Sequence, residues 1–154
     1  MANYIRPKRP GASIFFTVAL ADRRSDLLVR QVATLREAVA HTKALRPFQI
    51  DAWVVLPDHI HAVWTLPSDD ADFSTRWKDI KTHFTKAVGQ TGLRSQSKLA
   101  KGEVGIWQRR FWDHHIRNDD DFTQHVQYCR WNPVKHGLVT NPTDWPYSSI
   151  HRDS

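Results

Sequence analysis

The pattern of apolar and polar residues divides the chain into short segments with strand or helix character. Strands are predicted where β-branched and aromatic residues cluster between Pro, Gly or Asp residues, at 11–20, 48–57, 59–66 and 106–117. Helices are predicted where apolar residues recur at helical spacing, at 27–44, 73–88 and 118–137. Capping residues stand at the helix starts, namely Ser25 or Asp26, the segment 68–72, and Asn118 or Asp119.

The order of these elements is β, α, β, β, α, β, followed by one further helix. This order predicts a ferredoxin-like α+β fold (split βαβ, RRM-like), in which two helices cover one face of an antiparallel four-stranded sheet. The short Pro57-Asp58 turn predicts that segments 48–57 and 59–66 form a hairpin. The C-terminal helix is then available to cover the other face of the sheet.

Length and composition favour one packed domain. A chain of 154 residues suits a single domain over 1–154, with a basic arm at 1–10, a flexible loop at 89–105 and a turn-rich tail at 138–154. Apolar residues make up 40% of the chain, which argues against disorder. The single cysteine, Cys129, excludes an internal disulfide and a thiolate zinc cluster. No apolar run is long enough for a signal peptide or a membrane span, so we expect a soluble cytoplasmic protein.

Two histidines stand one residue apart in the predicted strand 59–66. Because side chains alternate across a strand, His59 and His61 should share one exposed face while Ile60, Ala62 and Trp64 point into the core. Two neutral imidazoles at this spacing suit a divalent cation, and the lack of thiolates leaves several metals open. The alternative is a pair of partly exposed histidines at a sheet edge that bind nothing.

The predicted helix 118–137 offers a partner for this pair. Tyr128 and Asn132 are four residues apart and share one helical face, with Gln124 a turn earlier and Lys135 near the far end. A tyrosine hydroxyl beside a two-histidine metal site is a credible nucleophile toward a phosphodiester, and the Asn132 amide oxygen could complete the protein ligands. The alternatives are a half-buried tyrosine at a helix edge and an asparagine that ends the helix before proline.

The chain is strongly basic, with a net charge of +6 and a pI near 9.8. Its positive residues gather in patches interleaved with aromatic residues, as suits a nucleic acid, because cations bind phosphate and rings stack on unpaired bases. The alternative is a merely solvated basic surface. The candidate phosphate contacts are Arg6, Lys8, Arg9, Arg76, Lys78, Lys81, Lys86, Arg109 and Arg110.

Four motifs follow one another along the chain: VVLPDHIHAVWTLP, GIWQRRFWDHHIR, QYCRWNPVKHGLV and DWPYSSIHR. Together they resemble the REP-associated tyrosine transposases, single-tyrosine members of the HUH endonuclease superfamily. The resemblance covers nearly the whole chain. The chain departs from the family after the tyrosine, where Cys129 and Arg130 replace the usual isoleucine and histidine.

The resemblance implies roles for particular residues. His59 and His61 would bind Mg²⁺ or Mn²⁺, Asn132 would be the third ligand, and Tyr128 would be the nucleophile. In the family this tyrosine cleaves single-stranded DNA beside a palindromic hairpin, leaving a 5′-phosphotyrosine link and a free 3′-hydroxyl that can reverse the reaction. The resemblance also implies a bacterial protein associated with the nucleoid, acting on hairpin DNA without ATP.

The other histidines and the tail are expected to have structural roles or to contact DNA. Adjacent strand residues point to opposite faces, so His114 and His115 are not expected to chelate one ion and are assigned to structure or DNA contact. The spacing of His83, His125 and His136 demands no chemistry. The tail aromatics are expected to cover the sheet or a helix, with a gate for the DNA site as the alternative.

The sequence is also compatible with two other functions. One is a non-catalytic module of ferredoxin-like fold that binds a nucleic-acid hairpin. The other is a metal-dependent hydrolase of small phosphates, for which the basic, aromatic-rich surface would be wasteful. The protein could act as a monomer or a homodimer, and a C-terminal segment long enough to fold back favours the monomer.

Overall fold

The computed structural model describes residues 9–89 and 105–152. Arg6, Lys8 and most of the expected arm lie outside these ranges, as does most of the expected loop at 89–105. A turn at Pro10-Gly11 leads into the first strand, and in it the Ala12 N–H donates to the Arg9 carbonyl. Gly11 has a φ of +72°, a left-handed conformation that glycine adopts without strain.

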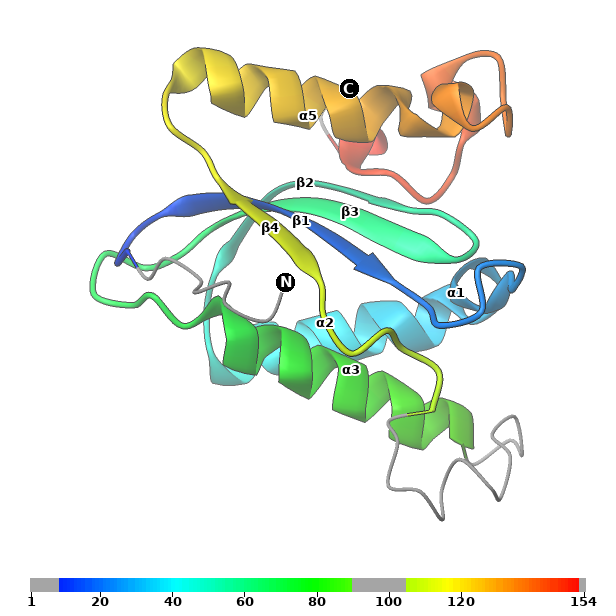
Figure 1. Cartoon of the computed structure of the whole chain (residues 1–154), viewed down its shortest axis with the longest axis horizontal. Helices are drawn as coiled ribbons and strands as arrows, with labels where there is room; N and C mark the ends of the chain where they lie inside the picture. The colour runs from blue at the N-terminus through cyan, green and yellow to red at the C-terminus, as the bar shows by residue number, and fades with distance from the viewer. Residues whose placement is uncertain (1–8, 90–104, 153–154) are drawn as a thin grey trace.

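Within the described ranges, four antiparallel strands form one sheet in the order β2-β3-β1-β4 (Figure 1). They are β1 Ser13–Ala19, β2 Gln49–Val55, β3 His59–Thr65 and β4 Trp112–His115. This strand order confirms the ferredoxin-like fold. The predicted hairpin is also confirmed, since β2 and β3 pair across a turn closed by the Leu56 N–H donating to the His59 carbonyl.

One face of the sheet is covered by α2 Val32–Leu45 and α3 Phe73–Gly89, which lie side by side (Figure 1). The main core lies between them and the strands, with Phe16, Ile60 and Trp64 buried against Trp77 and other residues of α3. As predicted, Ile60, Ala62 and Trp64 all belong to this core. Burial of these large side chains is the main force that closes the layer.

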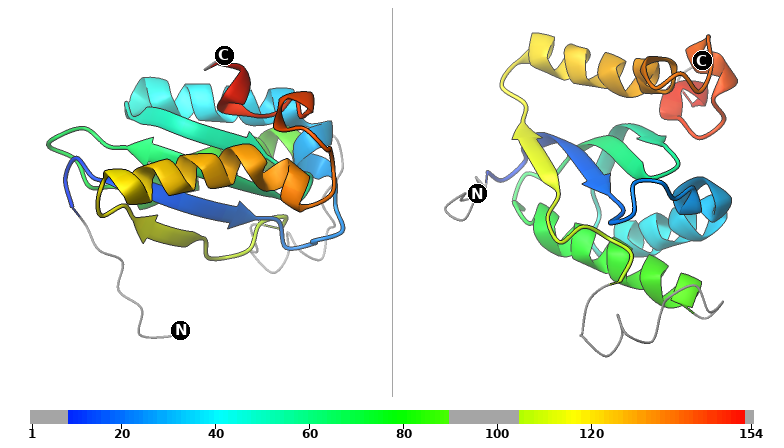
Figure 2. Two further views of the ribbon diagram at one scale, coloured as in Figure 1. Left: turned by 90° about the horizontal axis from the view of Figure 1, so that it is seen from above. Right: turned by 45° about the vertical axis from the view of Figure 1, so that its right-hand side comes forward.

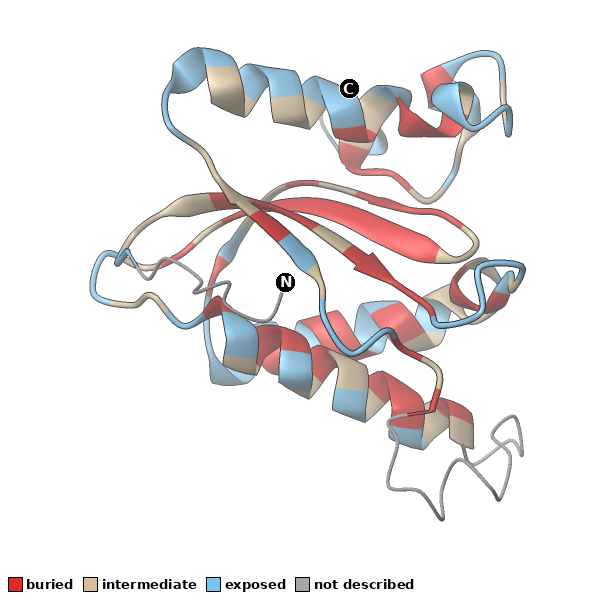
Figure 3. Ribbon diagram, viewed as in Figure 1, coloured by how far each residue is buried: buried red, intermediate tan, exposed pale blue. Residues whose placement is uncertain are grey.

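The opposite face is covered by the C-terminal helix, α5 Asp119–Lys135, which crosses the sheet above β2 and β3 (Figure 2). A second apolar cluster forms here, in which Phe15, Val54 and Val63 meet the buried Cys129 of α5. The outward side of α5 is exposed, whereas β3 is buried along almost its whole length (Figure 3). The sheet is therefore sandwiched between helices on both faces.

Two predicted elements differ from the structure. The helix predicted at 27–44 is divided at Gln31 into α1 Leu27–Arg30 and α2. The strand predicted at 106–117 pairs as a regular strand only over Trp112–His115, with an isolated bridge between Leu20 and Trp107. Between the two pairings the chain bends at Arg109. Arg109 and Arg110 are exposed and belong to no regular strand.

The tail folds onto the free edge of β2. It carries two short 3₁₀ helices, Pro142–Asp144 and Ser149–His151. The Val55 N–H donates to the Tyr147 carbonyl (2.8 Å), and the Trp145 indole N–H donates to the Val55 carbonyl (2.9 Å). The expectation that the tail aromatics cover the sheet is confirmed. No helix in the described ranges is both long and apolar enough to cross a membrane.

Candidate active site

His59 and His61 lie side by side on β3, on the face that α5 covers. Their ring centroids are 4.8 Å apart, so the predicted alternation is confirmed. The prediction of an exposed face was wrong, because His59 is only 4% exposed and His61 only 5%. The helix α5 and its side chains shield both histidine rings from solvent.

Each histidine is oriented by a hydrogen bond at its Nδ1 atom. The Asp58 carboxylate lies 2.8 Å from Nδ1 of His59, and the Thr17 hydroxyl of β1 lies 2.9 Å from Nδ1 of His61. These two bonds engage Nδ1 of each ring, so Nε2 is the atom that each histidine would offer to a metal ion. Outer partners of this kind fix the tautomer and orientation of metal-binding histidines.

Both rings are held in the neutral form. Burial, with smaller contributions from neighbouring charges, lowers the pKa of His61 to about 3. Burial also lowers the pKa of His59, although the hydrogen bond to Asp58 opposes this shift. Burial raises the pKa of Asp58, but hydrogen bonds with Arg23 and His59 outweigh it, so the net pKa lies below its usual value. The result is a pair of neutral imidazoles beside an ionised carboxylate.

Tyr128 of α5 lies directly against this pair. Its ring centroid is 5.2 Å from that of His61 and 5.7 Å from that of Phe15, and its side chain is 37% exposed. Lys135 lies over the same ring at 4.9 Å and donates a hydrogen bond to the tyrosine hydroxyl at 3.3 Å. The hydroxyl is therefore held near a positive charge while one side of the residue remains open to solvent.

Asn132 is 1% exposed, and neither atom of its amide has a hydrogen-bond partner among the described residues. It lies on α5 between Tyr128, which contacts His61, and His136, whose ring lies 5.2 Å from that of His59. The alternative that Asn132 ends the helix is wrong, since α5 continues through Pro133 to Lys135. An unpaired buried amide costs about 1–3 kcal/mol, so a ligand for it is to be expected.

Two histidine nitrogens and one amide oxygen fit a divalent cation. These are the residues predicted as ligands, and the orphaned amide of Asn132 is the structural observation that supports them. His136 is a neighbour that the sequence analysis missed. Its spacing was the available signal, because positions 128, 132 and 136 recur every four residues on one helical face.

A second cluster joins His114 of β4 to Asp121 and His125 of α5. The Asp121 carboxylate lies 2.8 Å from Nε2 of His114 and 3.1 Å from Nδ1 of His125, and it also accepts the Arg117 N–H. The Arg117 backbone N–H and His114 lower the pKa of Asp121 to about 2. These three side chains have atoms close enough to share a metal ion, and hydrogen bonds hold the three residues together. His115 points to the other face, against Phe73, as predicted.

The basic residues do not act as one set. The burial of Arg76 contradicts the expected phosphate contact, because its side chain is 2% exposed and its guanidinium binds Asp70 and the Arg46, Pro47 and Asp72 carbonyls. Its role is to join α3 to the preceding loops. Arg9, Lys78, Lys86, Arg109 and Arg110 are exposed.

Three of the predicted phosphate contacts meet around a groove of about 310 Å³ between α3 and the chain before β4. Lys78, Lys81 and Arg109 line it together with the aromatic residues Trp77, Trp107 and Phe111. The Lys81 amine lies 5.5 Å from the Phe111 ring centroid. The structure thus brings together cations that are 31 positions apart in sequence (78 to 109).

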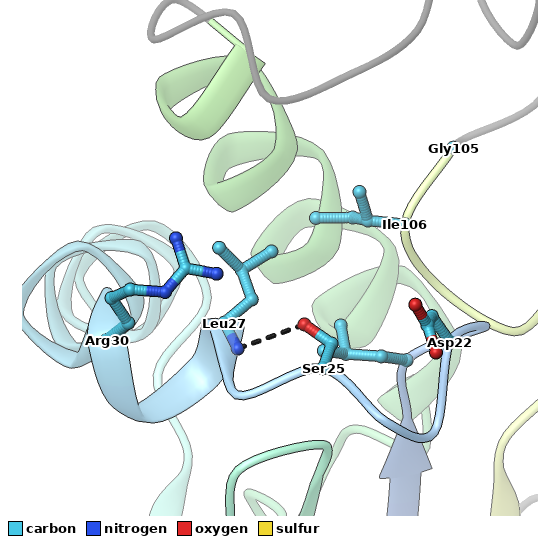
Figure 4. A pocket seen from close by; sticks show the side chains of 7 residues that line it. Asp22, Ser25, Leu27, Arg30, Gly105 and Ile106 are labelled. Atoms are coloured by element: carbon cyan, nitrogen blue, oxygen red, sulfur yellow. Dashed lines mark hydrogen bonds between the residues drawn. The ribbon is translucent and has the colours of Figure 1, made fainter.

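A different pocket, of about 200 Å³, lies beside α1 (Figure 4). It is lined by Leu20, Asp22, Ser25, Leu27, Arg30, Gly105 and Ile106, and the Ser25 hydroxyl accepts the Leu27 N–H at 3.1 Å. Among the described residues, its lining contains no histidine, tyrosine or asparagine. It therefore holds none of the residues of the candidate active site, and its charged side chains bind their neighbours, Asp22 the Arg24 N–H and Arg30 the Asp26 carboxylate.

Comparison with known proteins identifies relatives of the chain. No protein-family model matches the chain. A REP-associated tyrosine transposase of Escherichia coli is 50% identical over 153 residues, which cover 99% of this chain and 85% of that protein. A Haemophilus influenzae protein of the same family name is 42% identical, with 99% of this chain and 88% of that protein covered.

Solved structures give the same result. A REP-associated tyrosine transposase bound to a REP hairpin superposes with a TM-score of 0.89 at 49% identity, covering 99% of this chain and 85% of that one. A Deinococcus radiodurans protein described as a transposase shares the fold alone, with a TM-score of 0.53 at 14% identity and coverages of 82% and 91%. On the strength of 50% identity over almost its whole length, the chain belongs to the REP-associated tyrosine transposases and is an enzyme of the transposase class.

Proposed function

We propose that this protein cuts and rejoins single-stranded DNA beside a palindromic hairpin, through a covalent bond between the DNA and Tyr128. The observation that carries the proposal is the packing of Tyr128 against His61, with the unpaired amide of Asn132 one turn further along the same helix. A relative of 49% identity is solved with a REP hairpin, which supports hairpin DNA as the substrate.

In the proposed reaction the Tyr128 hydroxyl oxygen attacks a phosphorus atom of the DNA backbone. A bond forms between the tyrosine oxygen and phosphorus, and the bond from phosphorus to the 3′-oxygen breaks. The tyrosine loses its proton and the departing 3′-oxygen gains one. The 5′-phosphate stays on the enzyme until a 3′-hydroxyl attacks it, which restores a DNA phosphodiester and frees Tyr128.

The protein groups around Tyr128 have separate tasks in this proposal. His59, His61 and Asn132 would hold Mg²⁺ or Mn²⁺, which withdraws charge from the scissile phosphate when it is bound. Lys135 positions the tyrosine hydroxyl through its hydrogen bond and places a positive charge beside the oxygen that reacts. Phe15 packs on His61 at 5.5 Å and on Tyr128 at 5.7 Å, so it fixes both rings relative to each other.

Basic side chains would bind the DNA phosphates without reading the sequence. Lys78, Lys81 and Arg109 form one basic groove, and Arg110 and Arg9 are exposed beyond it. The predicted contacts Arg6 and Lys8 fall outside the described residues and stay predictions. Because phosphate contacts release counterions, binding should weaken steeply as salt is raised.

Trapping the covalent adduct tests the proposal. The protein would be incubated with a labelled REP-type DNA hairpin that carries single-stranded arms, with Mg²⁺ or Mn²⁺, and resolved on a denaturing gel. We expect a labelled protein band that disappears in Tyr128→Phe. The matched controls are Tyr4→Phe and Tyr147→Phe, which remove the other two of the 3 tyrosines and should both retain the adduct.

The outcomes separate this proposal from the non-catalytic alternative. An adduct that survives in Tyr128→Phe would show that another residue is the nucleophile. Tight hairpin binding that survives a chelator, with no adduct under either metal, would identify a hairpin-binding module that does not cut.

A further inference from the structure

A cleft of about 410 Å³ opens beside Tyr128, on the side of the sheet that α5 covers. It is lined by Phe15 and Thr17 of β1, Trp112 of β4, and Gln124, His125 and Tyr128 of α5. We call it the β4 cleft. The proposed metal ligands are absent from its lining, so the cleft is a space that adjoins the metal site across Phe15, Thr17 and Tyr128.

The most unusual wall of the β4 cleft is Trp112, whose side chain is 65% exposed. By contrast, Trp64, Trp77 and Trp107 are at most 4% exposed and belong to the core. Trp112 pairs in register with Thr17, and both side chains face α5 at the outer strand of the sheet. An exposed ring at the wall of a cleft offers a flat face on which an unpaired base can stack.

The opposite wall is held in place by the cluster of His114, Asp121 and His125. Asp121 binds both histidines, and the rings of His114 and His125 stack with their centroids 4.7 Å apart. Phe15 contacts the His125 ring from the other side, at 4.8 Å. This arrangement fixes the His125 ring as a rigid part of the cleft.

Gln124 completes the cleft with an exposed amide that has no hydrogen-bond partner within the described part of the chain. An amide offers a donor and an acceptor side by side, which is the pattern that reads the edge of a nucleobase. Among the described residues, no carboxylate lines the cleft. A flat ring beside an exposed amide matches an unpaired nucleotide.

We propose that the β4 cleft binds one unpaired base of the substrate's single-stranded arm, stacked on Trp112 and read at its edge by Gln124. This inference rests on the proposed function, which makes Tyr128 the residue that meets the scissile phosphate. Because Tyr128 lines the cleft, the base belongs to a nucleotide next to that phosphate. The cleft thus selects the position of the cut, while the metal site and Tyr128 perform it.

An abasic scan with matched variants tests the inference. The probe is a REP-type DNA hairpin with single-stranded arms, in which one arm nucleotide at a time lacks its base. Affinity is measured with Tyr128→Phe protein, which should bind without cutting, and cutting is measured with Tyr128 intact. We expect one position next to the scissile phosphate at which loss of the base weakens binding by roughly 5- to 100-fold, the range for base stacking on an aromatic ring.

The variants assign that position to the cleft. Trp112→Ala should weaken binding of the intact probe by a similar factor and should no longer respond to the abasic substitution at that position. Trp112→Phe, which keeps a stacking ring, should recover most of the affinity. Gln124→Ala should keep the response to base removal but lose the preference among the four bases. Trp131→Ala removes another exposed tryptophan, 53% exposed and outside the cleft, and should retain the full response of the parent protein.

The inference is overturned if no arm position is sensitive to base removal, or if Trp112→Ala and the abasic substitution weaken binding additively. Either result can occur while the adduct on Tyr128 still forms, in which case the proposed function stands and only the base site is wrong. Absence of any adduct with Tyr128 intact would instead refute the proposed function, and the binding arm of the test would still decide whether the cleft holds a base.

Discussion

The hydroxyl oxygen of Thr17 on β1 lies 2.9 Å from Nδ1 of His61 on β3, its direct partner in the strand register. The bond joins a residue of the first strand to one 44 positions later. It engages Nδ1 of His61 and helps to hold the ring, so Nε2 is the atom that would face a metal ion. The candidate metal site is therefore a property of the sheet register as well as of the two closely spaced histidines.

Thr17→Val should weaken Mn²⁺ binding by about 10- to 100-fold, the usual effect of removing an outer partner of a metal-binding histidine. Valine keeps the shape of threonine but cannot hydrogen bond, so His61 would lose the hydroxyl that holds its Nδ1 atom. Isothermal titration with Mn²⁺ measures the effect. Thr17→Ser keeps the hydroxyl and should bind Mn²⁺ nearly as well as the parent protein; equal affinity for the valine variant would contradict an orienting role.

Much of this site could be predicted because it depends on local periodicity. Alternation along β3 placed His59 and His61 on one face, and helical spacing placed Tyr128 and Asn132 together. The order of elements was sufficient to predict the sheet and the position of α5, since few topologies connect such a series of short segments. The four-residue spacing would also have indicated His136.

The missed features depend on contacts between segments that are distant in sequence. Arg76 looks like a surface cation in a basic helix, and only the fold shows that the Arg46 and Pro47 carbonyls, 30 and 29 positions away, surround it. The cluster around Asp121 similarly requires β4 to lie next to the start of α5. The burial of His59 and His61 follows from how closely α5 packs, which residue spacing does not determine.

Asn132→Leu should separate stability from metal binding. Without metal, the free energy of unfolding should rise by about 1 kcal/mol, because an unpaired buried amide is replaced by an apolar side chain of similar size. With Mn²⁺, the stabilisation that the parent protein gains should shrink or vanish. Urea unfolding with EDTA and with Mn²⁺ measures both effects.

Asn132→Asp is the comparison for that experiment. A buried carboxylate should destabilise the protein without metal and should recover stability when Mn²⁺ is added, because the new side chain is a good oxygen ligand. If Mn²⁺ stabilises Asn132→Leu as much as the parent protein, Asn132 is not a ligand.

Stability should fall as the pH is lowered from 6.5 toward 5. The pKa of His61 is about 3 in the folded protein and 6.5 when the ring is free, so the unfolded chain takes up the proton first. The free energy of unfolding therefore has its full value above pH 6.5, where the ring is neutral in both states, and decreases as the pH falls toward 3. The decrease should be about 2 kcal/mol between pH 6.5 and 5. Denaturant unfolding in EDTA at several pH values measures this loss.

His61→Gln should make the same pH dependence shallower but not flat, because burial lowers the pKa of His59 as well. The pKa of Asp121, about 2, affects stability only at lower pH and does not disturb this window. Identical pH dependence in His61→Gln and the parent protein would show that His61 does not remain neutral in the fold.

Arg76→Met should destabilise the protein by about 3 kcal/mol or more, since it leaves the Asp70 carboxylate and three carbonyl groups without their donor. Its affinity for a REP-type hairpin, corrected for the folded fraction, should be unchanged. Lys78→Gln should do the reverse, with little effect on stability but weaker DNA binding and a salt dependence reduced by about one counterion. A loss of DNA affinity in fully folded Arg76→Met protein would show that Arg76 does contact DNA.

The tail should protect the outer edge of β2. Trp145→Phe removes the indole N–H that donates to the Val55 carbonyl, at a cost of about 1 kcal/mol, and loosens the tail that also accepts the Val55 N–H. We expect faster hydrogen exchange at the amides of Val55 and Trp53, the second of which is bonded to the Ser149 hydroxyl at 2.9 Å. An uncovered edge strand is also a template for pairing between chains, so association at high concentration should increase. The affinity for Mn²⁺ should be unchanged, because His59 and His61 lie on the inner strand β3. Unaltered hydrogen exchange at the amides of Val55 and Trp53 would contradict a protective role for the tail.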